Sequence, residues 1–436
     1  MRIEETDKQS TFAQRTSRRA SSHRLIVAIV ALAIIFTAAT LRSTITSMGA
    51  LTLWVQDDLG LSSAAMGLVT TLPLLAFAAS ALMMNEISKR FGNSRSLAIG
   101  CAAIACGIIW RSYGSDIGLF GGTILLGIGI SAGNVLLPAV VRERFPVHVG
   151  IMTALYTTTM SLFAGGAAGL ASSLMGSLDD WRNILAGIAP FAAIGALLWL
   201  AVRFLGRATG DKRPKQTTTP KHTKLLSKHL VKSPITWWIT GLFGVQSILF
   251  YGFVAWLPSI LNAANISQDA ITTCVALFPI VGIPCTLFCP PLAQRLRRQR
   301  MLGATIGALC ALGVFALLFA HTDQAAIAAV TLLGFALGAP FCLCMFYFGV
   351  RTEDPDDASR LSSIAQTFGY LLAALGPACL GLLVDLSGSW SVALVIMFGL
   401  ALLLIICGWK SGTGSIPAAN ATQRIQQRAD DASRRP

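Results

Sequence analysis

Charged side chains are scarce in this sequence, and the long apolar stretches contain almost none. Only 12% of the 436 residues are Asp, Glu, Lys or Arg, whereas 54% are hydrophobic. Soluble proteins carry about 25% charged residues, so the composition excludes a set of ordinary soluble domains. The apolar residues do not alternate with a period of two, which excludes a membrane-spanning β-barrel. Helices are therefore expected, because lipid offers backbone polar groups no partners of its own.

The sequence also lacks the residue groupings that support metal or nucleotide chemistry. None of the ten cysteines forms a Cys-x-x-Cys pair, and all of them fall in apolar stretches. We interpret them as small packing residues. The five histidines fall in expected loops and tails. With no nucleotide-binding loop and no catalytic grouping, we expect no enzyme, no metal and no other cofactor.

What the sequence does contain is twelve apolar blocks. A bilayer core of about 30 Å requires about 20 residues of helix, and each block is long enough to cross it. We therefore predict an all-α membrane protein with twelve transmembrane helices. The blocks begin near Leu25, Ala64, Ser96, Leu119, Gly150, Asn183, Trp237, Ile271, Met301, Ala325, Leu361 and Trp390.

The basic residues are unevenly distributed among the segments between these blocks. If the N-terminus is cytoplasmic and the helices alternate, 31 of the 34 Lys and Arg lie in cytoplasmic segments. Arg111 and Arg182 then lie outside, and Arg42 lies within the first block. This asymmetry follows the positive-inside rule. It predicts an inner-membrane protein with both termini in the cytoplasm, and it accounts for the net charge of +14 without a nucleic-acid partner.

Landmarks of the first half of the chain recur in the second half at a near-constant offset. Because the offset contains an even number of helices, the two halves have the same orientation. Parallel six-helix repeats are the plan of the major facilitator fold, in which the solute site lies between the halves near the membrane midplane. The matching pairs are Ser62 and Ser267, Pro73 and Pro279, Asp116 and Asp323, and Trp181 and Trp390.

The repeat divides the chain into five segments. A stretch rich in Lys, Thr and Pro separates the halves, and we interpret it as a cytoplasmic linker. Residues 1–24 are polar and basic without an apolar core, so we do not expect a cleavable signal peptide. The segments are an N-terminal cytoplasmic tail (1–24), an N-terminal bundle (25–206), the linker (207–236), a C-terminal bundle (237–409) and a C-terminal cytoplasmic tail (410–436).

Arg42 is the one charged residue expected deep within a block. An Arg at the centre of a membrane helix costs about 2.5–3.5 kcal/mol on insertion scales, so it should face a polar cavity. The planar guanidinium fork suits an anion or a nitro group. Two structural alternatives remain, namely an Arg bonded to backbone carbonyls and an Arg that extends outward to the membrane surface.

Uncharged polar residues in other blocks are further candidates for the lining of a cavity. Gln366 and Tyr370 are four residues apart and share a helix face, as do Gln246 with Phe250 and Ser247 with Tyr251. Each of these side chains could instead form a hydrogen bond between helices. The candidate solute-binding residues are Arg42, Asn134, Tyr156, Gln246, Tyr251, Gln366 and Tyr370.

Local motifs resemble those of the major facilitator superfamily. Lys89-Arg90-Phe91-Gly92 with Arg95 is similar to the superfamily's motif between the second and third helices, although Lys89 stands where Asp is usual. This resemblance implies a gate or loop role for Arg90, Gly92 and Arg95. Thr123 stands where drug exporters carry Arg, and the fifth block lacks the Pro of the antiporter motif, which argues against a proton-driven multidrug exporter.

A closer resemblance is to the cyanate and 2-nitroimidazole transporter family within that superfamily. It rests on stretches spread over residues 25–409. The family resemblance implies a secondary transporter of a small anion or a nitroimidazole-like aromatic, with the lipid bilayer as its other partner. A transport-derived sensor or receptor, or an exporter of another small drug-like compound, is the alternative. The oligomeric state is left open, and a monomer is compatible with the sequence. The similar stretches are 41–46, 72–77, 133–138, 233–234, 256–261 and 366–377.

The acidic residues bear on the loops and on energy coupling. The acidic loop 353–357 is expected to be solvated in the cytoplasm, with pairing to basic loops as an inner gate as the alternative. Glu86 and Asp385 fall near opposite ends of their helices, and no carboxylate is expected deep in a block. We therefore hypothesise that the solute itself neutralises Arg42 and that any proton travels on the solute.

Overall fold

The computed structural model describes residues 2–145, 147–178, 180–208, 228–296, 298–353 and 355–417. This part of the chain is almost wholly helical, with one isolated bridge between Thr352 and Ile416. The helices are α1 (Arg2–Ala50), α2 (Thr52–Leu59), α3 (Ser63–Phe91), α4 (Asn93–Tyr113), α5 (Asp116–Arg144), α6 (Val149–Leu178), α7 (Trp181–Ala186), α8 (Ala189–Ala208), α9 (Lys228–Lys232), α10 (Pro234–Ala263), α11 (Gln268–Ile280), α12 (Ile283–Arg295), α13 (Gln299–Leu318), α14 (Asp323–Val350), α15 (Pro355–Ser387) and α16 (Trp390–Ser411).

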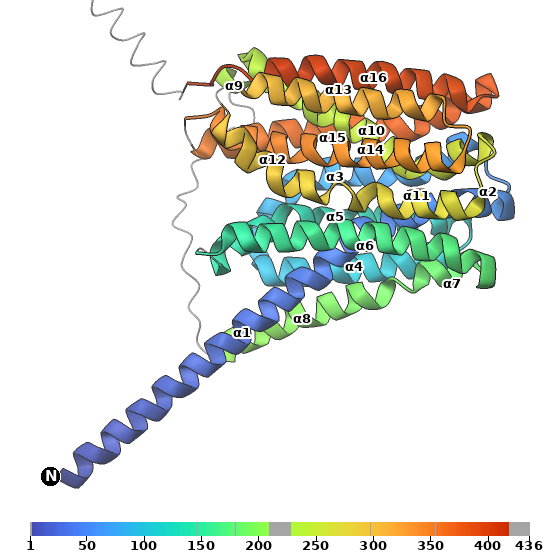
Figure 1. The fold of residues 1–436 in the computed structure, drawn as a ribbon. Coiled ribbons are helices and arrows are strands. Elements are labelled where there is room, and N and C mark those ends of the chain that lie inside the picture. The colour runs from blue at the N-terminus through green and yellow to red at the C-terminus, as the bar shows by residue number, and fades with distance from the viewer. Residues whose placement is uncertain are drawn as a thin grey trace, which may run out of the picture.

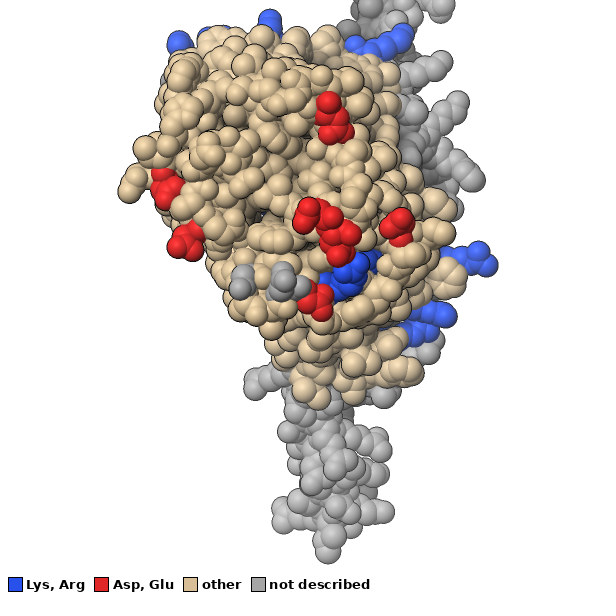
Figure 2. All heavy atoms as spheres, turned by 90° about the vertical axis from the view of Figure 1, so that its right-hand side faces the viewer, with Lys and Arg blue, Asp and Glu red and all other residues tan. Residues whose placement is uncertain are grey.

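The long helices lie side by side in a bundle, with the first six expected spans on one side and the last six on the other (Figure 1). The start of α1 and the short α9 lie at one end of the bundle, which we call the tail end (Figure 1). The short helices α2 and α7 lie at the opposite end, which we call the far end (Figure 1). Acidic side chains gather on the face at the far end, where basic side chains are few (Figure 2).

Eleven segments of the described chain are long and apolar enough to cross a membrane. They agree with eleven of the twelve expected blocks. The fifth block corresponds to α6, which has 30 residues and whose apolar residues are interrupted by several Thr, Ser and Gly. At about 1.5 Å per residue, α6 extends about 45 Å, which exceeds the thickness of a bilayer core.

The two halves repeat local structure as well as sequence. Ser62 caps the N-terminus of α3 by accepting a hydrogen bond from the Ala65 amide. Ser267 caps α11 in the same way through the Ala270 amide. One departure is that the helix continues through Pro73, whereas the eighth span breaks into α11 and α12 shortly after its own proline. The repeat therefore preserves the start of this span but not its continuity.

Contacts between the halves gather at the far end. The Thr52 hydroxyl donates to the Ala255 carbonyl over 3.1 Å, and Ser172 and Thr272 share a hydrogen bond of 2.8 Å. Gly67 allows α3 to approach α15 closely, since a Cβ at this position would lie 2.6 Å from the Pro377 carbonyl oxygen. These contacts hold the halves together at the far end in this conformation.

Some expected segment boundaries differ from the helices. The backbone of α1 is helical from Arg2, so the helix continues through most of the expected N-terminal tail. The expected linker contains α9 and the first residues of α10, and its residues 209–227 lie outside the described chain. The expected C-terminal tail is described only to residue 417.

Arg111 corrects one expectation directly. The sequence places it outside the membrane, but its side chain is enclosed in the bundle and only 2% exposed. It belongs to the last turn of α4, and Nη1 donates over 3.1 Å to the carbonyl of Thr44 on α1. Because the long side chain folds back among the helices, the position of its Cα near the helix end gave the wrong location for its charge.

Candidate functional site

Arg42 lies on α1, and its side chain reaches the C-terminal half. The guanidinium carbon lies 5.1 Å from the centre of the Phe250 ring on α10 and 5.5 Å from the Phe341 ring on α14. The side chain is partly buried, and within the described chain its nitrogens donate to no protein acceptor. Phenyl rings attract a guanidinium through their faces but offer it no oxygen or nitrogen acceptor. The N–H groups of Arg42 are therefore available to a further acceptor.

The two phenylalanines belong to an aromatic cluster from five helices, which consists of two groups of rings bridged by the Arg42 guanidinium. Its members come from α3, α10, α11, α14 and α15, and most of them lie close to the middle of their helices. Neighbouring ring centres within it are 5.1–5.8 Å apart, the separation at which aromatic side chains attract one another. We define the aromatic cluster as Phe77, Phe243, Phe250, Tyr251, Phe278, Phe341 and Tyr370.

Tyr251 and Tyr370 are the two candidates from the sequence that belong to this cluster. Both are buried, and both lie within electrostatic reach of the Arg42 guanidinium. The Tyr370 ring lies edge-on to Phe243, with ring centres 5.1 Å apart. Gly369 makes this packing possible, because a Cβ there would overlap the Phe243 ring. Gly369 and Tyr370 of α15 thus build part of the wall around Arg42.

Asn134 and Tyr156 are the two candidates from the N-terminal half besides Arg42. Asn134 on α5 is partly exposed, and no hydrogen bond to its amide occurs within the described chain. Its neighbour Gly133 packs directly on Leu41, so α5 approaches α1 next to Arg42. Tyr156 on α6 is half-buried and packs against the core. Both remain candidates for the lining of the solute pathway.

Gln246 and Gln366 use their amides within their own helices. Gln246 is buried and donates to the hydroxyl of Ser247 over 2.7 Å. Gln366 donates over 2.8 Å to the hydroxyl of Ser362, one turn earlier. Within the described part of the chain, neither amide forms the hydrogen bond between helices that the sequence left open. Both remain candidates for solute contact only through their other polar atoms.

The loop motif between α3 and α4 forms a compact turn at the tail end. Gly92 separates the two helices with a φ of 86°, in the left-handed region that glycine adopts without strain. Arg90 and Arg95 both lie over the ring of Phe91, at 5.6 and 5.3 Å. The side chain of Lys89 lies outside the described part. This geometry places the basic motif on the surface of the N-terminal half, away from the aromatic cluster.

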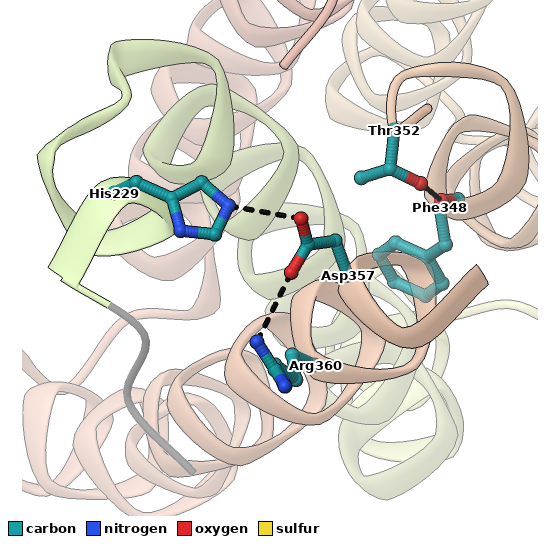
Figure 3. Close-up of polar contacts among 5 residues, drawn as sticks. All are labelled: His229, Phe348, Thr352, Asp357 and Arg360. Atoms are coloured by element: carbon teal, nitrogen blue, oxygen red, sulfur yellow. Dashed lines mark hydrogen bonds and ion pairs between the residues drawn. The ribbon is translucent and has the colours of Figure 1, made fainter. Parts of the chain in front are cut away.

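The acidic loop at the tail end is not simply solvated. Asp357 is buried and binds His229 of α9 over 2.9 Å and Arg360 of its own helix over 3.2 Å (Figure 3). The expectation of a solvated loop is therefore wrong for Asp357. Its contact with His229 attaches the end of the linker to the start of α15, because a buried carboxylate needs partners. Glu353 in the same loop is exposed.

The aromatic side chains and Arg111 are the features that sequence reasoning missed. Phe341 and Phe243 contain no polar atom that would single them out among the 22 phenylalanines. A small cavity between the halves borders the cluster on the side toward the far end. It is lined by Thr46 and Ala168 of the N-terminal half and by Phe253 and Phe278 of the C-terminal half, among others. The surroundings of Arg42 are thus aromatic and apolar.

Known proteins agree with this architecture. The family model described as Major Facilitator Superfamily matches residues 30–377. The chain belongs to the major facilitator superfamily. It is therefore a membrane transporter of a small solute, and its six-helix halves follow the superfamily plan.

Individual relatives cover nearly the whole chain. The 2-nitroimidazole transporter of Escherichia coli (strain K12) is 34% identical over 384 residues, which are 87% of this chain and 94% of that protein. The cyanate transport protein CynX of the same strain is 24% identical over 372 residues, which are 84% and 93% of the two chains. Among solved structures, the inward open conformation of the xylose transporter XylE from E. coli superposes with a TM-score of 0.71 at 13% identity. It covers 89% of this chain and 96% of that one. This likeness to XylE concerns the fold.

Proposed function

We propose that the chain carries a small anion or a nitro-bearing aromatic across the inner membrane, with Arg42 as the group that binds it. The observation that carries this proposal is the Arg42 guanidinium, which reaches between two rings of the opposite half and whose N–H groups have no acceptor among the described residues. A cation in this position needs an electron-rich partner, because an unpaired charge in an apolar interior is costly. The solute supplies that partner.

The chemistry of Arg42 and the aromatic cluster narrows the class of solute. A guanidinium fork matches two oxygens of a flat group, or one terminal atom of a small anion. Nitro and cyanate groups both concentrate negative charge on terminal atoms, and these are the groups named in two relatives. The surrounding rings of Phe250, Phe341 and Tyr251 favour a planar, apolar body. The site therefore suits a compact solute with a flat acceptor group.

Alternating access explains why Arg42 and its rings come from different halves. When the halves rock about the site, the contacts at the far end separate and the site opens to that side. In this chain those contacts are hydrogen bonds and close helix–helix approaches at glycines. Such contacts can break and re-form without large changes in side-chain packing. We take both termini and the linker to be cytoplasmic, so the far end faces the outside.

The test is uptake of radiolabelled 2-nitroimidazole and of cyanate into proteoliposomes. We expect at least one solute to be transported, and we expect Arg42→Lys to lose most of that transport although the charge is kept. The lysine ammonium lacks the planar fork and holds a flat group less well. Arg300→Lys is a matched control, because Arg300 also lies over an aromatic ring, 4.9 Å from Trp409, but at the tail end.

Two results would overturn the proposal. One is transport at the wild-type rate by a folded Arg42→Ala protein. The other is a wild-type protein that binds these solutes and moves none of them, which would favour a receptor. Folding of each variant is checked by size-exclusion chromatography before reconstitution.

A further inference from the structure

The hydroxyl groups of Tyr251 and Tyr370 lie inside the bundle, and the protein itself does not use them. Both side chains are only 8% exposed. Neither hydroxyl forms a hydrogen bond within the described chain, yet neither belongs to the buried polar atoms that are sealed from water. Nε and Nη2 of Arg111 are sealed in that way, whereas the two tyrosine oxygens border open space. Because a buried hydroxyl without a partner is costly, both oxygens need a further hydrogen-bond partner.

The two tyrosine rings are the ends of a loop of side chains that passes through Arg42. Neighbouring ring centres in this loop are 5.1–5.8 Å apart, and the guanidinium carbon lies 5.1 and 5.5 Å from the rings on its two sides. The ends of the loop meet, because Tyr251 and Tyr370 lie within electrostatic reach of each other and of Arg42. The guanidinium and both hydroxyls are thus arranged around one space. In order, the members of the loop are Tyr370, Phe243, Phe341, Arg42, Phe250 and Tyr251.

The members of the loop that face the other half are not fully packed. Arg42, Phe250 and Phe341 all remain partly exposed, although the guanidinium lies between the two rings. Gln366, one turn before Tyr370 on α15, is partly exposed as well. Since Arg42 and the two rings contact each other across the halves, their exposed surface borders a space between the halves. Room for a solute therefore lies beside the guanidinium.

The charge and the walls of this space restrict the solute. No Asp or Glu of the described chain forms an ion pair with Arg42, so the solute has to bring one negative charge. An uncharged nitro compound would leave the guanidinium unbalanced. The walls are aromatic rings, which attract a planar aromatic body. An ion as small as cyanate balances the charge but is too short to use those rings. An aromatic monoanion meets both requirements.

The number of donors around the space matches a carboxylate. An ionised carboxylate offers about four lone-pair sites on its two oxygens. The planar fork of Arg42 can donate to two of these sites in the bidentate arrangement. The hydroxyls of Tyr251 and Tyr370 can donate to the other two, because nothing in the described chain accepts from them. All the free donors at the site are then used by one group of the solute.

We propose that the transported solute is an aromatic monocarboxylate with a single ring, held by Arg42, Tyr251 and Tyr370. Its carboxylate accepts hydrogen bonds from the guanidinium and from both hydroxyls, and its ring packs against Phe250 and Phe341. The two tyrosines thereby determine specificity, because their hydroxyls distinguish a charged carboxylate from an uncharged group of the same shape. This inference rests on the function proposed above, since it names the class of solute for the same site.

Uptake of radiolabelled benzoate by proteoliposomes of the full chain tests the proposal, at neutral pH and with protein-free liposomes as the background. We expect saturable uptake that is mostly lost in Arg42→Lys. Two unlabelled inhibitors separate charge from shape: nitrobenzene has the shape of benzoate without its charge, and acetate has the charge without the ring. Each should inhibit about tenfold less effectively than unlabelled benzoate, because hydrogen bonds to a charged acceptor are the stronger ones and acetate lacks the ring contacts.

Tyr251→Phe and Tyr370→Phe remove one hydroxyl each and keep the ring that packs in the loop. We expect each to raise the KM for benzoate several-fold, while inhibition by nitrobenzene stays as in wild type. A purely structural role of the tyrosines would not separate the two compounds. Tyr113→Phe is the matched control and should keep the wild-type KM, because Tyr113 is 55% exposed at the end of α4.

Absence of saturable benzoate uptake would overturn the inference. If the same vesicles take up 2-nitroimidazole or cyanate, the proposed function stands and only the class of solute is wrong. Equal inhibition by nitrobenzene and benzoate would also overturn the inference, as would a wild-type KM for benzoate in both tyrosine variants. The comparison of inhibitors uses the wild-type protein, so it decides the question if the variants fail to fold.

Discussion

Asp385 of α15 accepts a hydrogen bond from the backbone amide of Ala64, at the start of α3, over 2.8 Å. The other carboxylate oxygen accepts from the Ser63 amide over 3.2 Å. A carboxylate at a helix N-terminus satisfies free amides and interacts favourably with the helix dipole. Here the carboxylate comes from the opposite half, so this cap exists only while the far end is closed.

We predict that Asp385→Ala favours opening of the far end. The readout is thiol labelling of a cysteine at Thr71, which is buried between the halves and donates to the Ala374 carbonyl over 2.7 Å. The exposed Cys106 and Cys379 are first changed to Ser. Labelling with a membrane-impermeant reagent should be several-fold faster in Asp385→Ala, because two amide contacts are lost.

The matched control for this experiment is Asp269→Ala. Asp269 lies in the first turn of α11, so this change also removes a carboxylate at the far end. It should leave the labelling rate unchanged. Equal rates in Asp385→Ala and the parent would show that the cap does not hold the gate.

Two adjacent glycines on α6 should respond in opposite ways to substitution by alanine. A Cβ on Gly165 would overlap the Ala276 carbonyl of α11, whereas a Cβ on Gly166 meets nothing within 4 Å. Overpacking of a close contact costs about 1–3 kcal/mol, so Gly165→Ala should lower the Tm and loosen the far end. Gly166→Ala should be neutral or stabilising, by up to about 1 kcal/mol, because alanine favours a helix. Thermal unfolding of both variants is the measurement. If Gly166→Ala lowered the Tm as much as Gly165→Ala does, the explanation by close packing at Gly165 would be contradicted.

The aromatic partners of Arg42 should contribute to solute affinity more than to the rate of transport. Phe250→Leu and Phe341→Leu each remove one ring from the guanidinium. These contacts lie within the protein and orient the guanidinium that is proposed to bind the solute. We therefore expect KM to rise several-fold, and by no more than the roughly 30-fold that about 2 kcal/mol would give. Uptake kinetics in proteoliposomes provide the values. Phe288→Leu, at an exposed position on α12, is the control and should keep the wild-type KM.

The stability of the far end should depend on pH through Asp58. Hydrogen bonds from Trp181 and Arg182, together with the charge of Arg182, hold the pKa of Asp58 below its usual value. A depressed pKa in the folded state stabilises the fold above the ordinary aspartate pKa of about 3.9. That contribution is lost as the pH falls through the lowered pKa. Asp58→Asn should therefore lower the Tm at pH 6, and the difference from wild type should shrink below about pH 4.

A constant difference for Asp58→Asn between pH 6 and pH 3.5 would show that the Asp58 carboxylate does not stabilise the fold through these contacts.

Energy coupling is predicted not to require a protein carboxylate near Arg42. Within the described chain no Asp or Glu pairs with Arg42, and Asp385 is part of the far-end cap instead. The side chain of Glu86 lies outside the described part. We expect proton-driven uptake to persist in Glu86→Gln. If this change abolishes proton-driven uptake but spares counterflow exchange, a protein carboxylate carries the proton and the hypothesis is wrong.

The location of the spans could be predicted from the sequence, because span length and hydropathy are properties of a continuous stretch of chain. The repeat could be predicted for the same reason, and Ser62 and Ser267 indeed cap corresponding helices. Arg42 was identifiable because a charge inside an apolar block is conspicuous without any knowledge of its neighbours. These conclusions depend on local composition and on order along the chain alone.

The partners of each side chain depended on the tertiary structure, because they are set by how each helix is rotated and which helix it meets. Sequence spacing could not show that Phe250 and Phe341 cover Arg42, since the rings come from helices far apart in the chain. Nor could it show that Arg111 folds back into the bundle or that Asp357 is buried against His229. The sequence by itself determined where the membrane helices are and which of them carries the central charge. Only the packing of the two halves decided what surrounds that charge, because both rings that lie against the Arg42 guanidinium come from the opposite half.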